Sequence, residues 1–303
     1  MKKLVEKCID NRLLLFALII AINIISLNSI TFAQHLTPRP PLFGIPAKTL
    51  PQNHWVFRSY WIYNNYNSRW SSTNNSMTDV PDGLNFNTNF LWGKIRYGIT
   101  NNLTLIINVP YVHKSLKNNG VSKSGSGLGD IIGALLYKFH NDKPNRFLIS
   151  GLLFTKSPTG KSSGLGKNEL ATGTGSFDYG AAILPEKEFG KWDMRLSSFY
   201  LFRGDNDENV NLGDLLSFSW STAYNLSKNF IAEGTLYYKR TFNNSRNGEA
   251  INNSDTYLLQ LIPGIQYRIY NSFLIQFVMP LTITQKRPFG SDYETWVGLY
   301  YMI

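Results

Sequence analysis

The sequence predicts an all-β protein, a closed antiparallel transmembrane β-barrel of about 12 strands. Three observations support this prediction: an N-terminal leader, a rhythm of short and long joints between apparent strands, and strands in which every second residue is apolar. Together they are typical of barrels of the bacterial outer membrane, in which tight turns at one end alternate with longer loops at the other.

Residues 1–33 have the pattern of a signal peptide. Basic residues precede position 13, positions 13–25 are apolar apart from Asn23, and Thr31-Phe32-Ala33 is a small-x-small site suited to cleavage. The apolar run is short for a membrane-spanning helix, which needs about 20 apolar residues. The only cysteine, Cys8, lies in this leader. The mature chain would therefore have no disulfide, thiolate metal site or cysteine nucleophile.

Residues 34–53 are rich in proline and show no strand period. We interpret them as an N-terminal extension or a short plug, because they are too few to form a domain. Residues 54–303 then form the predicted outer-membrane β-barrel.

The barrel region consists of strand pairs separated by joints of two lengths. The short joints are at 101–102, 141–145, 189–191, 227–229 and 271–272. The long joints are at about 69–83, 118–127, 158–173, 205–213, 244–254 and 286–292. Alternation of these two sets requires twelve strands. The first strand then begins, and the last strand ends, on the side of the short turns.

The strands show the two-residue period of a sheet with one apolar face. In 214–227, Phe218 and Trp220 share one face, and serines occupy the positions between them. The segments 273–284 and 292–303 alternate in the same way. A soluble strand packs such an apolar face on a core, whereas a barrel strand can turn it toward lipid and leave small polar groups inside.

Composition narrows the classes of protein and partner. Hydrophobic content is 43% and mean hydropathy is −0.19, which argues against a helical membrane protein. The net charge of +10 comes from lysines and arginines scattered singly rather than clustered. This pattern does not favour nucleic acid, but it suits contact with anionic membrane lipids and lipopolysaccharide. The remaining partners we predict are a small-molecule solute and the barrel assembly machinery.

Counting from the short turns places a set of charged and amide side chains on the inward face. The predicted lumen-lining residues are Asp193, Arg195, Glu233, Gln266 and Arg268. All lie within a few residues of the short-turn end of their strands. Opposite charges that face one another across a narrow lumen can line a polar passage or close it by pairing.

The sequence predicts no cofactor, no metal site and no enzyme, with one alternative left open. The four histidines have no metal-ligand spacing. However, an outer-membrane lipid-modifying hydrolase needs a serine and a histidine near one rim. His113 lies near the long-loop end of its strand, and adjacent segments offer serines.

Several segments resemble one family of outer-membrane proteins. They are Arg96-Tyr97-Gly98-Ile99-Thr100 followed by Val109-Pro110-Tyr111, Gly127-Leu128-Gly129-Asp130-Ile131 running into Tyr137-Lys138-Phe139, Phe154 through Ser157-Pro158-Thr159-Gly160, and Gly173-Thr174-Gly175-Ser176-Phe177-Asp178-Tyr179-Gly180. In order and spacing they resemble the transporters named after the MetA pathway of phenol degradation, over roughly residues 84–303.

This resemblance implies a β-barrel in the outer membrane and passive uptake of a small solute, including hydrophobic or aromatic ones. It transfers no catalytic residue. The alternatives are the hydrolase described above and a closed structural barrel.

Overall fold

The computed structural model describes residues 44–270 and 272–302. All of them belong to one compact unit of the chain, Pro38–Ile303. The predicted signal peptide, 1–33, lies outside the described residues, as do residues 34–43 of the predicted extension or plug. No helix in the part of the chain that the structure describes is both long and apolar enough to cross a membrane.

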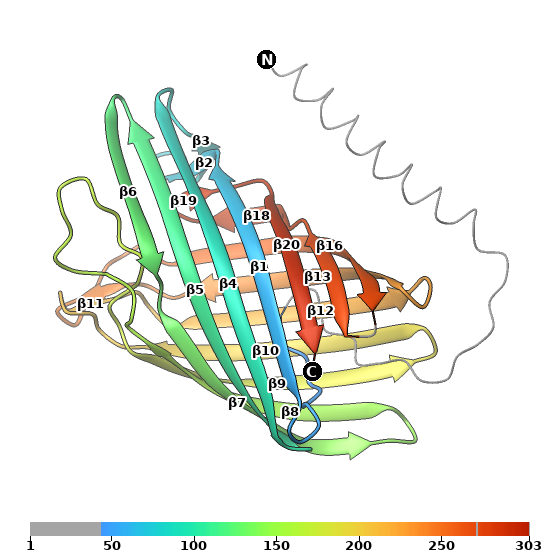
Figure 1. Ribbon diagram of the computed structural model, residues 1–303. Helices are drawn as coiled ribbons and strands as arrows, with labels where there is room; N and C mark the ends of the chain where they lie inside the picture. The colour runs from blue at the N-terminus through green and yellow to red at the C-terminus, as the bar shows by residue number, and fades with distance from the viewer. Residues whose placement is uncertain (1–43, 271, 303) are drawn as a thin grey trace, which may run out of the picture. The chain divides into compact units, whose positions relative to one another are not determined.

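One antiparallel sheet dominates the structure (Figure 1). Its strands are β1 (Trp55–Tyr66), β4 (Leu84–Thr100), β5 (Leu103–Asn118), β6 (Val121–Leu128), β7 (Ile131–Asp142), β8 (Phe147–Ser157), β9 (Asp178–Phe189), β10 (Trp192–Arg203), β12 (Leu215–Asn225), β13 (Phe230–Thr241), β16 (Thr256–Tyr270), β17 (Phe273–Val278), β18 (Leu281–Lys286) and β20 (Glu294–Met302). Both β6 and β7 pair with β5, and both β17 and β18 pair with β16. These 14 segments therefore form twelve barrel strands, two of which are interrupted.

The sheet closes on itself. Each barrel strand pairs with the next along the chain, and the first strand, β1, pairs with the last, β20, from Val56↔Met302 to Asn64↔Glu294. Closure removes the free edges that a sheet would otherwise expose. The predicted closed barrel of about 12 antiparallel strands is confirmed.

Two smaller sheets are built from the longer joints. One contains β2 (Ser68–Ser71), β3 (Ser76–Asp79) and β19 (Phe289–Gly290). The other contains β11 (Val210–Asn211), β14 (Ser245–Arg246) and β15 (Glu249–Ala250). We call this end of the barrel the long-loop end and the opposite end, with the turns at 101–102 and 190–191, the short-turn end.

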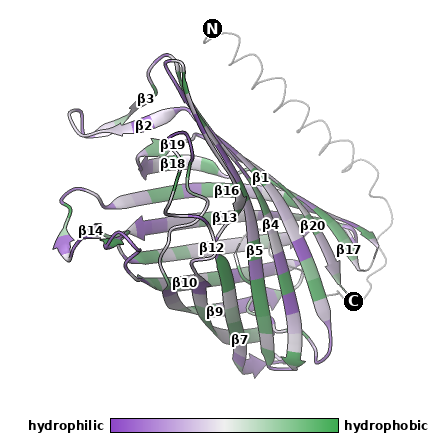
Figure 2. Ribbon diagram, turned by 60° about the vertical axis from the view of Figure 1, so that its left-hand side comes forward, coloured by the Kyte–Doolittle hydropathy of each residue, from purple (hydrophilic) through white to green (hydrophobic). Residues whose placement is uncertain are grey.

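The polarity of the two faces of the sheet is the reverse of that in a soluble protein: apolar side chains are exposed and polar side chains are buried. Along β1, Trp55 and Trp61 are 41% and 46% exposed, whereas Arg58 between them is 6% exposed. On β8, Leu153 is 67% exposed, while Ser150 is fully buried. Apolar and polar residues alternate along the strands in Figure 2. An apolar outer face and a polar inner face are what a barrel immersed in lipid requires.

The structure corrects two details of the predicted strands. The segment 118–127, expected as a long loop, is instead a tight turn at Asn119-Gly120 followed by strand β6. Both turn residues have positive φ, 45° and 85°, as a two-residue hairpin turn with the right twist requires. The three serines and three glycines in this segment obscured its strand character.

The second correction concerns 273–284, which was expected as one uninterrupted strand. It is divided into β17 and β18 at Met279-Pro280. The pairing of β18 with β16 also shifts register, since Leu259 faces Thr284 and Gln260 faces Thr282. Pro280 has no backbone N–H to donate to the sheet, which accounts for the break.

Candidate functional site in the barrel interior

The residues predicted to line the lumen all lie on the buried face of the sheet. They are Asp193 and Arg195 on β10, Glu233 on β13, and Gln266 and Arg268 on β16. None is more than 9% exposed. On the other parity of β10, Trp192 and Leu196 are 42% and 53% exposed.

Three of these residues form one ion-pair group. The Arg195 Nη2 atom donates to Glu233 Oε2 at 2.5 Å, and Arg195 Nη1 lies 3.6 Å from Asp193 Oδ2. Asp193 is fully buried. Because buried carboxylates are costly unless paired, the guanidinium stabilises both of them.

The other two predicted residues lie elsewhere on the inner face. Gln266 Oε1 accepts from Gln276 Nε2 at 3.0 Å, and Gln276 Oε1 accepts from both Arg58 Nε at 3.0 Å and the Tyr60 hydroxyl at 2.7 Å. Arg268 has no ion pair among the described residues, and its Nε has no hydrogen-bond partner there. The interior is thus divided into an ionic region and an amide network.

The segment 44–53 precedes β1 near the short-turn end; residues 45–50 lie inside the barrel, and 51–53 are exposed. Ala47 and Leu50 are 2% and 3% exposed. Ala47 packs in a cluster of inward-facing apolar side chains, which are Ile106, Ala134, Leu136, Leu152 and Leu184. Leu50 packs with Val56, Leu274 and Tyr300. The segment therefore buries apolar side chains against patches of the inner wall.

Backbone groups of this segment are hydrogen-bonded to the wall. The Ala47 N–H donates to Glu186 Oε2 at 3.1 Å, and the Ala47 carbonyl accepts from Ser150 Oγ at 2.5 Å. The Leu50 N–H donates to Thr104 Oγ1 at 2.8 Å. These bonds satisfy polar backbone groups that would otherwise be buried without partners.

Lys48 places an ammonium group among three carboxylates. Its Nζ lies 2.7 Å from Glu186 Oε1 and 3.7 Å from Asp193 Oδ2, and it also pairs with Glu188. Oxygens of these carboxylates lie within 4.8 Å of one another, a spacing that could hold a cation. Burial lowers the pKa of Lys48, but the carboxylates of Glu186, Asp193 and Glu188 more than offset this, so that the pKa is raised.

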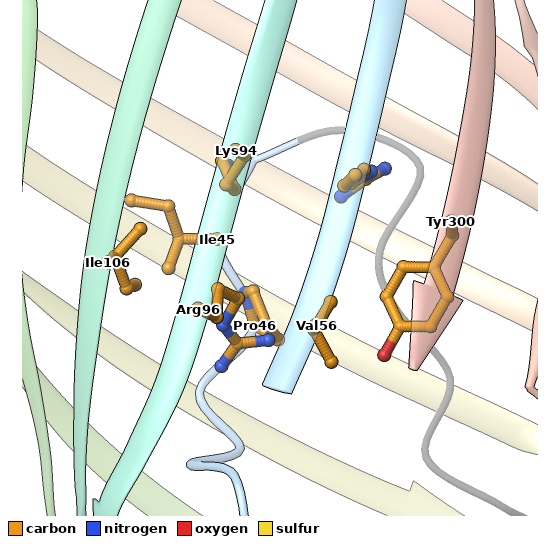
Figure 3. A pocket seen from close by; sticks show the side chains of 8 residues that line it. Ile45, Pro46, Val56, Lys94, Arg96, Ile106 and Tyr300 are labelled. Atoms are coloured by element: carbon orange, nitrogen blue, oxygen red, sulfur yellow. The ribbon is translucent and has the colours of Figure 1, made fainter. Parts of the chain in front are cut away.

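A basic patch lies on a different part of the wall, on β1 and β4. Arg58 and Lys94 are directly opposite in the register of these strands, and Arg96 is two residues beyond Lys94 on the same face. Figure 3 shows Lys94 and Arg96 beside Ile45 and Pro46 of the N-terminal segment. Arg96 Nη2 donates to the Lys48 carbonyl at 2.8 Å.

The sequence alone did not predict the roles of Lys48, Glu186 and the basic patch. A signal existed for Glu186, because alternation along β9 places it on the same face as the buried Asp178. Another existed for Arg58, which alternates with the outward Trp55 and Trp61. No local signal pointed to Lys48, since its segment has no strand period and its partners are distant in the sequence.

The histidine of the alternative hydrolase hypothesis has a serine beside it. His113 Nδ1 lies 2.6 Å from Ser126 Oγ, and both residues are on the exposed face. Asn89 is opposite His113 on the neighbouring strand β4. The row Asn89, His113 and Ser126 therefore crosses β4, β5 and β6 on the outer surface of the barrel.

The closed sheet, its apolar exterior and its polar interior define an outer-membrane β-barrel. The family described as "Putative MetA-pathway of phenol degradation" matches residues 72–293, and the chain belongs to this family. No curated protein matches the sequence.

Solved structures show the same fold. The COG4313 outer membrane channel from Pseudomonas putida F1 is similar with a TM-score of 0.73 at 14% identity, over 85% of this chain and 98% of that one. The beta domain of the Bordetella autotransporter BrkA has a TM-score of 0.51 at 9% identity, over 83% of this chain and 100% of that one. The NanC porin has a TM-score of 0.50 at 9% identity, over 80% and 98% of the two chains.

Proposed function

We propose that this protein is an outer-membrane channel for passive uptake of a small solute through the barrel interior. The observation that carries the proposal is a closed barrel with a polar interior, into which residues 44–53 enter from the short-turn end. The family description refers to phenol degradation, which supports a hydrophobic or aromatic solute. The apolar clusters around Ala47 and Leu50 offer such a solute surface to contact.

In this proposal, residues 44–53 act as a plug that is displaced when solute passes. Lys48 holds the plug to the wall through Glu186, Glu188 and Asp193. The short turns of outer-membrane barrels face the periplasm, so the plug would enter from that side. Removal of the Lys48 charge would leave the almost fully buried Glu186 without its cation, so we expect this substitution to loosen the plug.

Planar-bilayer recording and solute flux into liposomes test this function. Lys48→Gln removes the charge and shortens the side chain by one atom, and we expect larger conductance and faster flux of phenol than in the unmodified protein. Lys161→Gln is the matched control, because Lys161 pairs with Glu169 on an exposed loop. If neither the unmodified protein nor Lys48→Gln conducts ions or passes solute, the barrel is structural and not a channel.

We further propose that Asp193, Arg195, Glu233, Gln266 and Arg268 face the solute path and influence what passes. Cysteine labelling tests this in a chain whose only cysteine is Cys8. A lipid-soluble maleimide is expected to react with Met194→Cys and not with Arg195→Cys. The opposite pattern would place Arg195 on the lipid side and reject the assignment.

A second candidate function is hydrolysis of lipid acyl esters on the outer surface. It rests on the 2.6 Å contact between His113 Nδ1 and Ser126 Oγ, since a histidine in contact with a serine hydroxyl can act as its general base. Purified protein would be incubated with phospholipid and lipopolysaccharide. Acyl release that is lost in both His113→Ala and Ser126→Ala would establish the activity, and no release by the unmodified protein would exclude it.

A further inference from the structure

One hairpin supplies three carboxylates to the barrel interior at the short-turn end. Glu186 and Glu188 are two residues apart on β9, and Asp193 follows the turn on β10. Asp193 lies directly opposite Glu188 in the register of these strands. Like charges in such positions destabilise a sheet. The three carboxylates therefore need a cation among their oxygens.

The N-terminal segment supplies that cation. Lys48 Nζ lies 2.7 Å from Glu186 Oε1 and also pairs with Glu188. The Ala47 N–H donates to the second oxygen of Glu186, Oε2, at 3.1 Å. The segment thus contacts both oxygens of a carboxylate that is only 1% exposed. Departure of the segment would remove both contacts at once.

Asp193 lacks hydrogen bonds even while the segment is docked. It is fully buried, yet neither of its side-chain oxygens has a hydrogen-bond partner in the described part of the chain. Its two ion pairs are long, with Arg195 Nη1 at 3.6 Å and Lys48 Nζ at 3.7 Å from Oδ2. Both distances exceed those of a hydrogen bond. A buried carboxylate in this state is costly, and an ion that binds its oxygens directly would stabilise it.

The spacing of the oxygens suits a calcium ion. One oxygen from each of the three carboxylates lies within 4.8 Å of the others. Ca²⁺ binds carboxylate oxygens at about 2.3–2.6 Å, so that two of its ligands are at most about 5 Å apart. Mg²⁺ binds at about 2.0–2.1 Å in a stricter octahedral arrangement, which suits this spacing less well. The side chains of Lys48 and Glu188 are 24% and 23% exposed, so ions in solution can reach the group.

We propose that Glu186, Glu188 and Asp193 form a binding site for Ca²⁺, which becomes available when the N-terminal segment leaves the wall. In the docked state the ammonium of Lys48 occupies the place of the ion, so the ion and the segment exclude each other. The inference rests on the proposed channel function and gives that channel a regulator, because bound Ca²⁺ holds the barrel in its unplugged state. Water molecules complete the coordination of the ion.

Calorimetric titration of Ca²⁺ into the full-length protein in detergent tests the site. We expect Ca²⁺ to bind more tightly than Mg²⁺. We expect Lys48→Gln to bind Ca²⁺ about tenfold more tightly than the unmodified protein, the scale of one hydrogen bond to a charged group. Glu188→Gln keeps the shape of the side chain but removes a ligand charge, and it should weaken binding by a similar factor. Glu169→Gln is the matched control, because Glu169 also pairs with a lysine but does so on an exposed loop.

Thiol labelling in a Cys8→Ser background reports the position of the segment. Ala47→Cys places a thiol next to Lys48, at a position that is 2% exposed. We expect Ca²⁺ to increase the rate at which a water-soluble maleimide labels this thiol. The increase should be lost when Glu188→Gln is also present.

Equal affinity for Ca²⁺ in the unmodified protein, Glu188→Gln and Glu169→Gln, or no binding by Lys48→Gln, would overturn the proposal. Tighter binding of Mg²⁺ than of Ca²⁺ would overturn the assignment of the ion. Binding of Ca²⁺ that leaves the labelling of Ala47→Cys unchanged would overturn the exclusion between ion and segment. Neither measurement needs transport, so failure of this site and failure of the channel function are distinguishable.

Discussion

Lys48 brings one positive charge into a space where three carboxylates meet. Neither side of this contact is stable alone, because buried charges need partners. The segment 44–53 therefore stays inside the barrel only while these ion pairs are formed. They are formed only while the Lys48 amine is protonated.

This gives a pH dependence with a defined sign. The pKa of Lys48 is raised above its ordinary value of 10.5 by Glu186, Asp193 and Glu188 acting against burial. A raised lysine pKa stabilises the docked segment fully below the ordinary value, and the stabilisation is lost as pH rises through the raised one. We expect channel conductance to be constant from about pH 6 to about pH 9 and to increase only above the ordinary lysine range.

Lys48→Arg provides the control for this experiment. Arginine remains charged at pH values that deprotonate lysine, so Lys48→Arg is expected to keep the low conductance of the unmodified protein at high pH. An equal increase in both proteins would mean that the alkaline effect arises elsewhere in the barrel.

At the scale of elements, Asp130 joins three parts of the chain at the gap between β6 and β7. Its carboxylate accepts from the backbone N–H groups of Gly160 and Thr174 at 3.1 and 2.8 Å, and Lys156 Nζ lies 3.2 Å away. These residues come from separate segments that carried the family resemblance. The network fixes the loop 158–177 to the barrel wall.

Asp130→Ala is expected to release this loop. Each buried N–H left without an acceptor costs about 1–3 kcal/mol, so trypsin should cut faster after Lys161 and Lys167, which limited proteolysis would detect. Glu169→Gln is the control, because the Lys161–Glu169 pair is exposed and exposed ion pairs contribute little to stability. The same cleavage rate in both variants would contradict a role for Asp130 in holding the loop.

The strand pattern of the barrel was largely predictable from the sequence. The number of strands followed from the alternation of short and long joints. The face of each side chain followed from the two-residue period, which exposes Phe218 and buries Ser217 whatever the neighbouring strands are. The hairpin at Asn119-Gly120 was missed, although Asn-Gly between two strands is a strong turn signal.

The sequence did not predict which side chains contact one another inside the barrel. Arg195 and Glu233 were predicted to face inward from local counting alone, and their pairing depends on the neighbouring strands β10, β12 and β13. The contact between Lys48 and Glu186 joins residues 138 positions apart by number. No local pattern specifies such a contact, because it depends on how the closed sheet brings β9 close to the segment that precedes β1.

At the scale of the whole molecule, exterior and interior have opposite chemistry. Large apolar side chains such as Leu153 and Tyr179 are more than half exposed, whereas the charged side chains of Asp193 and Glu186 are almost completely buried. Lipid or detergent can cover such an exterior, whereas its exposure to water would cause the protein to aggregate.

We therefore expect the purified protein to require detergent for solubility and to give a strand-rich circular dichroism spectrum in it. Removal of the detergent should cause aggregation, which light scattering would detect. A protein that stays monomeric without detergent, or a spectrum dominated by helix, would contradict the membrane barrel.

Closure of the sheet has a consequence for the order of folding. The seam joins Val56 to Met302 and Tyr60 to Gly298, so the first and last strands meet only when nearly the whole chain is in place. Pairings this distant in sequence form slowly. The segment with Ala47 and Leu50 adjoins β1, so it precedes every barrel strand in the chain. Since Lys48 precedes β1 and its partners Glu186 and Asp193 lie on β9 and β10, these ion pairs can form only after more than half of the strands have been synthesised.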